Sequence, residues 1–172
     1  MDQRPAQDEY TEFQSRYISL VPPEGDLRVI LREQTERILG LLGGLTEEQG
    51  SFRYAPEKWS IKEVIGHLID NDRIMSYRLL CFARGEQAQL PGYEESDYAA
   101  AAEYDRFTLQ EVLTHYRIVR ESTLDLLDSL PENSYTRTGM FNGVAMSVRA
   151  QACLITGHEL HHLRILQERY LH

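Results

Sequence analysis

The sequence predicts an all-α protein, a four-helix bundle with an N-terminal arm and long inter-helix loops. Apolar residues recur at helical spacing in four long segments, and capping residues stand where these segments begin. No segment alternates apolar and polar residues as convincingly as a half-buried strand would. For a chain of 172 residues, we expect one bundle domain over residues 26–172, preceded by an arm over residues 1–25.

The first two predicted helices begin at recognisable capping residues. One starts after the chain breaker VPPEG, is capped by Asp26, and keeps its helical spacing until Gly43. The other starts with a capping box, in which Ser60 and Glu63 satisfy free backbone N–H groups reciprocally. Its apolar residues continue to about Phe82, so both segments are predicted as long amphipathic helices.

The last two predicted helices each follow a long loop. A loop over residues 85–106 leads to a second capping box at residues 108–111, and the helix continues to about Leu130. A glycine-containing loop over residues 131–146 leads to Ser147, which is expected to cap a final helix that extends to residue 171.

Composition and charge argue against several classes of protein. The net charge of -9, a pI near 5.1 and the absence of a long Lys/Arg run argue against a nucleic-acid partner. No apolar run approaches the ~20 residues of a membrane helix, and the polar start MDQRPAQDEYTEF lacks the apolar part of a signal peptide. Cys81 and Cys153 lie in helical patterns without CxxC spacing, as packed, reduced thiols do. We therefore expect a cytoplasmic protein with no membrane partner.

Two histidines of the last predicted helix form a candidate metal-binding pair. His158 and His162 lie one turn apart on the stripe that should face the core, so their imidazoles can converge on one cation. His161 is rotated by about 100° from His162. His115 and His172 have no ligand-like partner in the pattern, and we expect structural or solvent-facing roles for them. Considered alone, the pair is as consistent with two packed histidines as with a metal site.

His67, on the second predicted helix, is the candidate third ligand. A single histidine on the flank of an apolar stripe is more often a satisfied core residue, but bundles build metal sites from inward-facing side chains on different helices. Three imidazoles would leave one tetrahedral position for water or substrate. Gly66 and Gly157 each precede a candidate ligand and would permit close helix approach. The combination predicts one divalent-metal site formed by His67, His158 and His162.

The stretch GHELHHLRIL also contains H-E-x-x-H, the helical signature of zinc proteases. The extended protease motif needs a glycine turn that brings back a third histidine, whereas this chain has Ile165 and Glu168 at the equivalent positions. The helix is therefore expected to continue, and we disfavour a protease. Glu159 is expected to make a surface or interhelix contact rather than act as a catalytic base.

Three stretches together resemble the DinB-like superfamily: FRYAPEKWSIKEVIGHLIDNDRIMSYRLLCFARGE, LPGYEESDY and GHELHHLRILQERYL. With YISLVPPEGDL near the start, the resemblance covers roughly residues 17–171. It implies a four-helix bundle and a divalent metal held by three histidines, which here are His67, His158 and His162. The superfamily includes bacillithiol- or mycothiol-dependent S-transferases, thiol-dependent isomerases and proteins named metal-dependent hydrolases.

Asp70 is a candidate catalytic residue beside the predicted metal site. It follows His67 by three residues on the same helix face, where it could orient an imidazole or accept a proton. An ion pair with Arg73 is an equally good interpretation. Where many relatives have Asp-Thr-Glu-Arg, residues 70–73 of this chain read Asp-Asn-Asp-Arg, so a role that needs the longer glutamate is not supported.

Other side chains near the predicted site have functional and structural interpretations. Trp59 and Tyr54 could line the rim of a pocket, although simple burial explains Trp59 as well. Arg73 and Arg78 could bind an acidic group of a substrate, but surface ion pairs explain them more simply.

The leading hypothesis is a metal-dependent enzyme with a small-molecule substrate, either a hydrolase or a thiol S-transferase. Zn²⁺ is the expected ion, with Ni²⁺ or Fe²⁺ as alternatives, and a low-molecular-weight thiol would be the co-substrate of a transferase. The second hypothesis is a non-enzymatic, metal-stabilised binding or stress-response protein. A homodimer is compatible with both.

Overall fold

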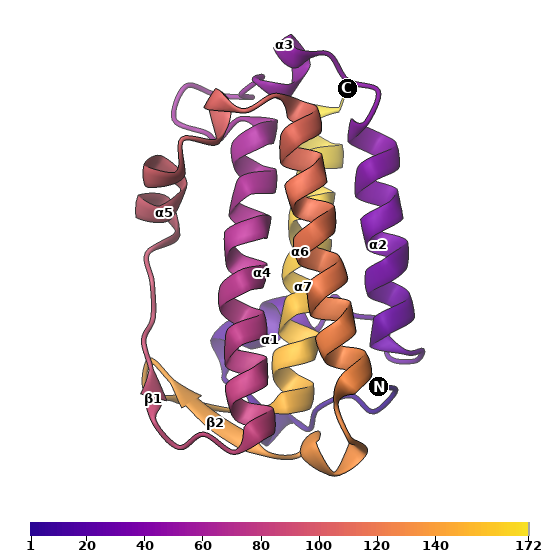
Figure 1. Ribbon diagram of the computed structural model, residues 1–172, viewed down its shortest axis with the longest axis vertical. Coiled ribbons are helices and arrows are strands. Elements are labelled where there is room, and N and C mark those ends of the chain that lie inside the picture. Colours follow the sequence, from indigo (N-terminus) through magenta and orange to yellow (C-terminus); the bar gives the residue numbers. More distant parts are fainter. Residues whose placement is uncertain (172) are drawn as a thin grey trace.

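Four long helices form the bundle, as the sequence predicts, in the computed structural model, which describes residues 1–171. Figure 1 shows that α2 and α7 run in one direction and that α4 and α6 run in the opposite direction. The connection from α4 to α6 therefore travels the length of the bundle. The long helices are α2 (Leu27–Leu42), α4 (Ile61–Arg84), α6 (Leu109–Ser129) and α7 (Val148–Ile165), and a π-helical turn (Leu166–Tyr170) continues α7.

The predicted capping residues start the four long helices. The Asp26 side chain accepts a hydrogen bond from the backbone N–H of Arg28 at the start of α2, and Ser147 caps α7 in the same manner. The boxes at Ser60 and Thr108 are complete, with the glutamate of each box accepting from the cap backbone N–H. The helix starts are therefore determined locally by the sequence.

Residues 1–25, which we predicted as an arm, contain folded structure. A short 3-10 turn (Gln7–Glu9) is followed by helix α1 (Glu12–Ile18), which packs against α7. A Cβ on Gly157 would lie 2.1 Å from the backbone oxygen of Tyr17, so the glycine of α7 permits this close approach. The segment thus contributes side chains to the centre of the protein.

A small three-stranded sheet at one end of the bundle was not predicted (Figure 1). Strands β2 (Thr138–Phe141) and β3 (Val144–Ser147) form a hairpin whose two-residue turn is Asn142-Gly143, both with positive φ. Strand β1 (Gln89–Leu90) pairs in parallel with β2. The predicted loop over residues 85–106 therefore contains a strand.

Short helices complete the connections between the long helices. They are α3 (Glu47–Gly50), α5 (Glu95–Ala102), and the 3-10 turns Tyr104–Arg106 and Glu132–Ser134. Within residues 1–171, none of the helices is both long enough and apolar enough to cross a membrane.

A layer of buried polar side chains divides the interior into two apolar clusters. One cluster contains Leu31, Leu79 and Leu154, and the other contains Ile65 and Leu163 among others. Between the two clusters, each long helix has polar residues at the inward-facing positions that apolar residues occupy elsewhere along the helix. These residues are Gln34, Thr35, His67, Asn71, Asp72, Arg120, Thr123, Thr156, His158 and Glu159.

Candidate metal centre

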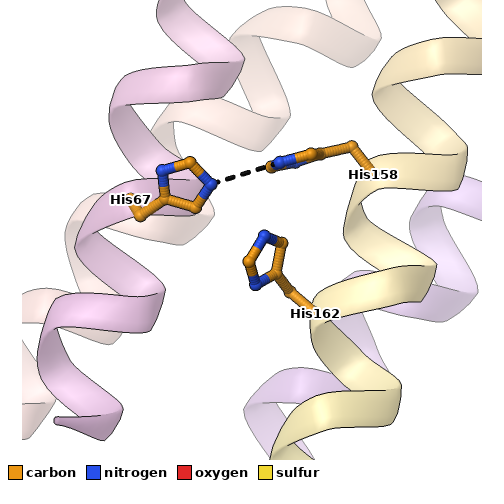
Figure 2. Close-up of side chains that lie close together, drawn as sticks. All are labelled: His67, His158 and His162. Atoms are coloured by element: carbon orange, nitrogen blue, oxygen red, sulfur yellow. Dashed lines mark hydrogen bonds between the residues drawn. The ribbon is translucent and has the colours of Figure 1, made fainter. Parts of the chain in front are cut away.

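The three predicted histidine ligands come together in the polar layer between α4 and α7. The Nε2 atoms of His67 and His158 are 3.2 Å apart, and the ring centre of His162 lies 4.8 Å from the ring centre of His67. Figure 2 shows the three side chains turned towards one another. One nitrogen from each of the three side chains lies within 4.8 Å of the others. The i, i+4 spacing of His158 and His162 places both on the face of α7 that is turned towards α4.

Burial keeps these imidazoles neutral. His67 and His158 are each 3% exposed. Burial, followed by the charge of His161, lowers the pKa of His67 to about 4. Burial, followed by the neighbouring imidazoles, also holds the pKa of His158 and His162 well below the usual value. Near pH 7 each ring therefore has a nitrogen lone pair available to a metal ion.

The arrangement fits one divalent cation. Two imidazole nitrogens bound to a tetrahedral zinc ion are roughly 3.3 Å apart, which agrees with the 3.2 Å between His67 and His158. Nδ1 of His162 is buried and has no hydrogen-bond partner among the described residues. The other ring nitrogen of His162 is the one turned towards His67 and His158 (Figure 2), so the three side chains together offer three neutral nitrogen donors, a set that suits one divalent cation.

Aromatic side chains from two other segments cover the cluster. The ring of Trp59 lies 4.9 Å from that of His67, and the ring of Tyr17 lies 5.3 Å from that of His158. Trp59 therefore contacts the candidate ligand directly, whereas Tyr54 is 39% exposed and packs against Tyr170. Sequence reasoning missed Tyr17 because nothing local indicates that the N-terminal segment folds onto α7.

The two glycines that precede candidate ligands permit close contacts, although neither brings two of the long helices together. A Cβ on Gly66 would lie 2.0 Å from the ring of Tyr104, and Gly157 accommodates the backbone of α1. The loop from α4 to α6 and the N-terminal helix therefore pack beside the histidines. Close packing of this kind keeps the positions of both ligand-bearing helices well defined.

Asp70 lies outside the histidine cluster. Its carboxylate accepts a hydrogen bond from the Tyr104 hydroxyl at 3.0 Å and pairs with Arg73 at 3.3 Å. Among residues 1–171, none of the hydrogen bonds joins Asp70 to the candidate ligands. These contacts match the ion-pair interpretation, and a role in proton transfer stays a prediction.

His161 and His115 are not among the clustered nitrogen donors, although the ring centre of His161 lies 5.1 Å from that of His162. His161 is half-buried, and its ring lies 5.4 Å from that of Tyr17. His115 packs against Phe107, with ring centres 5.3 Å apart. His172 lies outside the residues that the structure describes.

Glu159 makes the interhelix contacts expected for it rather than those of a protease base. It is 1% exposed and accepts hydrogen bonds from the Tyr116 hydroxyl and from the Arg120 guanidinium, both on α6. Arg120 also faces the Asp72 carboxylate, 3.5 Å away on α4. Beyond His162 the helix continues without a glycine turn, and exposed Glu168 pairs with Arg164. The contacts that define a zinc protease are not formed here.

The buried ion network around Arg120 was not identified from the sequence. Arg120 is 2% exposed and connects α4 to α7 through Asp72 and Glu159. Burial raises the pKa of both carboxylates, although the guanidinium opposes this effect. Arg120 interrupts the apolar stripe of α6, which is the signal that could have indicated a buried charge.

A cavity of about 380 Å³ opens beside the histidine cluster. Its walls come from α1, α4, α7, the loop before α5 and the β-hairpin, and include His158, Tyr17, Asn71 and Arg78. A volume of this size is typical of small-molecule sites. A larger cavity of about 490 Å³, lined by residues such as Phe52 and Tyr170, contains none of the three histidines. The smaller cavity is therefore the candidate substrate site.

Comparison with known proteins shows the family of this chain. The sequence profile of the DinB superfamily matches residues 30–166. A protein of Geobacillus thermodenitrificans named as a candidate metal-dependent hydrolase is 24% identical over 134 residues, covering 77% of this chain and 75% of the relative. The family match covers most of the chain, so the chain belongs to the DinB superfamily.

Solved structures share the fold. YfiT from Bacillus subtilis, described as a probable metal-dependent hydrolase with an unusual four-helix bundle topology, matches with a TM-score of 0.71 and 16% identity, over 97% of this chain and 91% of YfiT. A mycothiol-dependent maleylpyruvate isomerase matches with a TM-score of 0.66 and 9% identity, over 80% of this chain and 58% of the isomerase. At these identities the likeness establishes the bundle architecture.

Proposed function

We propose that this member of the DinB superfamily is a metal-dependent hydrolase of small molecules, with one divalent ion held by His67, His158 and His162. The observation that carries the proposal is the convergence of three neutral imidazoles next to a cavity. The name of the relative from Geobacillus thermodenitrificans supports the same reaction class. Zn²⁺ suits three imidazole donors best, with Ni²⁺ and Fe²⁺ as alternatives.

The bound ion would supply a Lewis acid that polarises an electrophile and acidifies a water or thiol at its open position. The chain's own groups would keep the site ready for this ion. Burial keeps the imidazoles of His67 and His158 neutral, while Trp59 and Tyr17 pack against their rings. The Arg120 network would hold α4 and α7 at the separation that the three ligands need.

Thiol-dependent group transfer is the second candidate function. It is supported by the mycothiol-dependent isomerase with the same fold. The chain's own cysteines are poor nucleophiles for this purpose, since burial raises the pKa of Cys153 to about 12 and neither cysteine lines the cavity beside His158. A transferase reaction would therefore use a low-molecular-weight thiol as co-substrate.

Metal analysis of untagged protein tests the site. We expect about one divalent ion per chain in the wild-type protein and in the His161→Ala control. The His67→Ala, His158→Ala and His162→Ala proteins should each lose most of this metal, because two imidazoles hold an ion more weakly than three. Wild-type protein without metal, or full metal in the His158→Ala protein, would refute the proposed site.

Activity assays separate the proposed reactions. The metal-loaded protein is tested against ester and amide substrates, and in parallel with reduced thiols and small electrophiles. Hydrolysis that disappears in the His158→Ala protein and persists in the His161→Ala protein would support the proposal. Turnover only with added thiol would favour the transferase, and stoichiometric metal without turnover would favour a metal-stabilised binding protein.

A further inference from the structure

A buried arginine without an acidic partner lines the cavity beside His158. Arg78 is 5% exposed, and within residues 1–171 no carboxylate oxygen lies within 4.0 Å of its guanidinium nitrogens. The chain's other buried arginine, Arg120, has two carboxylate partners. The Arg78 nitrogens that make no hydrogen bond are not among the buried unsatisfied atoms of the described residues, so they face the cavity rather than the packed interior.

The contacts of Arg78 leave most of its hydrogen-bonding capacity unused. Its Nη2 donates a 2.8 Å hydrogen bond to the carbonyl oxygen of Pro91. The guanidinium carbon lies 4.4 Å from the centre of the Phe141 ring and 6.0 Å from the centre of the Tyr93 ring. A guanidinium has five N–H donors in a planar fork that matches a carboxylate. The contact with Pro91 and the aromatic rings hold Arg78 in place, and the other donors remain for a ligand.

Arg78 and His158 line the same cavity. The rest of the wall combines aromatic and apolar side chains, among them Phe13, Tyr17 and Met75, with polar ones such as Asn71 and Asn142. The aromatic side chains offer a surface for an apolar part of a ligand, between the guanidinium at one side and the histidine cluster at the other.

The charge around the cavity favours a single negative charge on the ligand. Glu94 and Glu95 lie at its exposed rim. These carboxylates repel a polyanion, whereas one guanidinium matches one carboxylate in a bidentate pair. A carboxylate is thus a better match than a phosphate dianion.

We propose that this cavity binds a small carboxylic acid, whose carboxylate pairs with Arg78 and whose apolar body lies against the aromatic wall, so that its reactive group faces His158. The substrate class of the enzyme is then an apolar carboxylate. This inference rests on the proposed function for its catalytic meaning, but the binding event can be measured independently.

The test compares a carboxylic acid with its neutral amide on the metal-loaded, full-length protein. The probes are 3-phenylpropionate and 3-phenylpropionamide, which differ in charge at one end, and binding is followed by titration calorimetry and ligand-observed NMR. We expect the acid to bind about 10- to 100-fold more tightly than the amide to the wild-type protein, as expected for hydrogen bonds between charged groups. Equal binding of acid and amide would overturn the proposal without any variant.

Variants on α4 localise the effect. Arg78→Gln should abolish the preference for the acid, and Arg78→Lys should retain part of it because a single ammonium replaces the bidentate fork. Arg73→Gln is the matched control, since Arg73 is an exposed arginine of the same helix that pairs with Asp70, and it should bind both probes as the wild-type protein does. If Arg78→Gln fails to fold, Arg78→Lys and the wild-type comparison still decide the outcome. Loss of the preference in Arg73→Gln as well would overturn the assignment to Arg78.

Metal content, measured on the same samples, separates this inference from the proposed function. A preference that depends on Arg78 in protein that holds no metal would support the carboxylate site and refute the metal-dependent reaction. Stoichiometric metal without a preference for the acid would refute the carboxylate site alone. A preference for the acid that survives in Arg78→Gln but disappears after chelation would show that the acid binds the metal. That result would also refute the carboxylate site at Arg78.

Discussion

Replacing Arg120 by methionine should strongly destabilise the bundle. The guanidinium is 2% exposed and lies between the carboxylates of Asp72 and Glu159, which are 3% and 1% exposed. Methionine fills part of the volume but leaves two buried acidic groups without a cation. Removal of one partner from such a network costs about 3–5 kcal/mol of the free energy of unfolding. For a chain of this size that loss lowers the melting temperature by roughly 10 °C.

Urea unfolding followed by circular dichroism measures the effect. The matched control is Arg117→Met on the same helix, where an exposed arginine lies 3.9 Å from Glu121 and the expected change is about 0.5 kcal/mol or less. Adding Glu159→Gln to Arg120→Met should recover part of the loss, because it removes one of the two uncompensated carboxylates. A change below about 1 kcal/mol in Arg120→Met, or equal effects at both arginines, would refute the reasoning.

Three further predictions concern Gly157, Glu9 and Asp70. Gly157→Ala should cost about 1–3 kcal/mol of stability by displacing α1, since its Cβ would meet the Tyr17 carbonyl oxygen at 2.1 Å. The control Gly40→Ala, whose Cβ would have nothing within 4 Å, should stabilise the protein slightly. Equal melting temperatures of the two variants would contradict the predicted clash at Gly157. Glu9→Gln should cost about 1 kcal/mol above pH 4.5, chiefly because the hydrogen bond from Arg149 lowers the pKa of Glu9 to about 2. A carboxyl group whose pKa is lower in the folded state stabilises that state at every pH above its pKa in the unfolded state. The difference in melting temperature between Glu9→Gln and wild type should therefore fade between pH 4.5 and pH 2, and a constant difference would contradict the ion pair. Asp70→Asn should leave metal content unchanged, because Asp70 bonds to Tyr104 and Arg73; loss of metal would place it in the centre.

The predicted helix starts were confirmed because their causes are local. Asp26, Ser60, Thr108 and Ser147 each satisfy N–H groups within three residues, and this depends little on the rest of the chain. The hairpin was missed even though Asn142-Gly143 is a strong turn signal, since the flanking strands are only four residues each. Strand β1 pairs with residues about 50 positions later, and a two-residue strand has no pattern of its own.

The sequence by itself determined the four long helices, their caps and the three histidines that share inward faces, because helical periodicity and capping are properties of neighbouring residues. The tertiary structure alone decided which side chains surround those histidines. Tyr17 reaches His158 only because α1 packs on Gly157, and Arg78 lines the cavity without an acidic partner because the loop and the hairpin bury it. Burial and the lack of a counter-charge depend on segments far apart in the chain, and no local pattern records them.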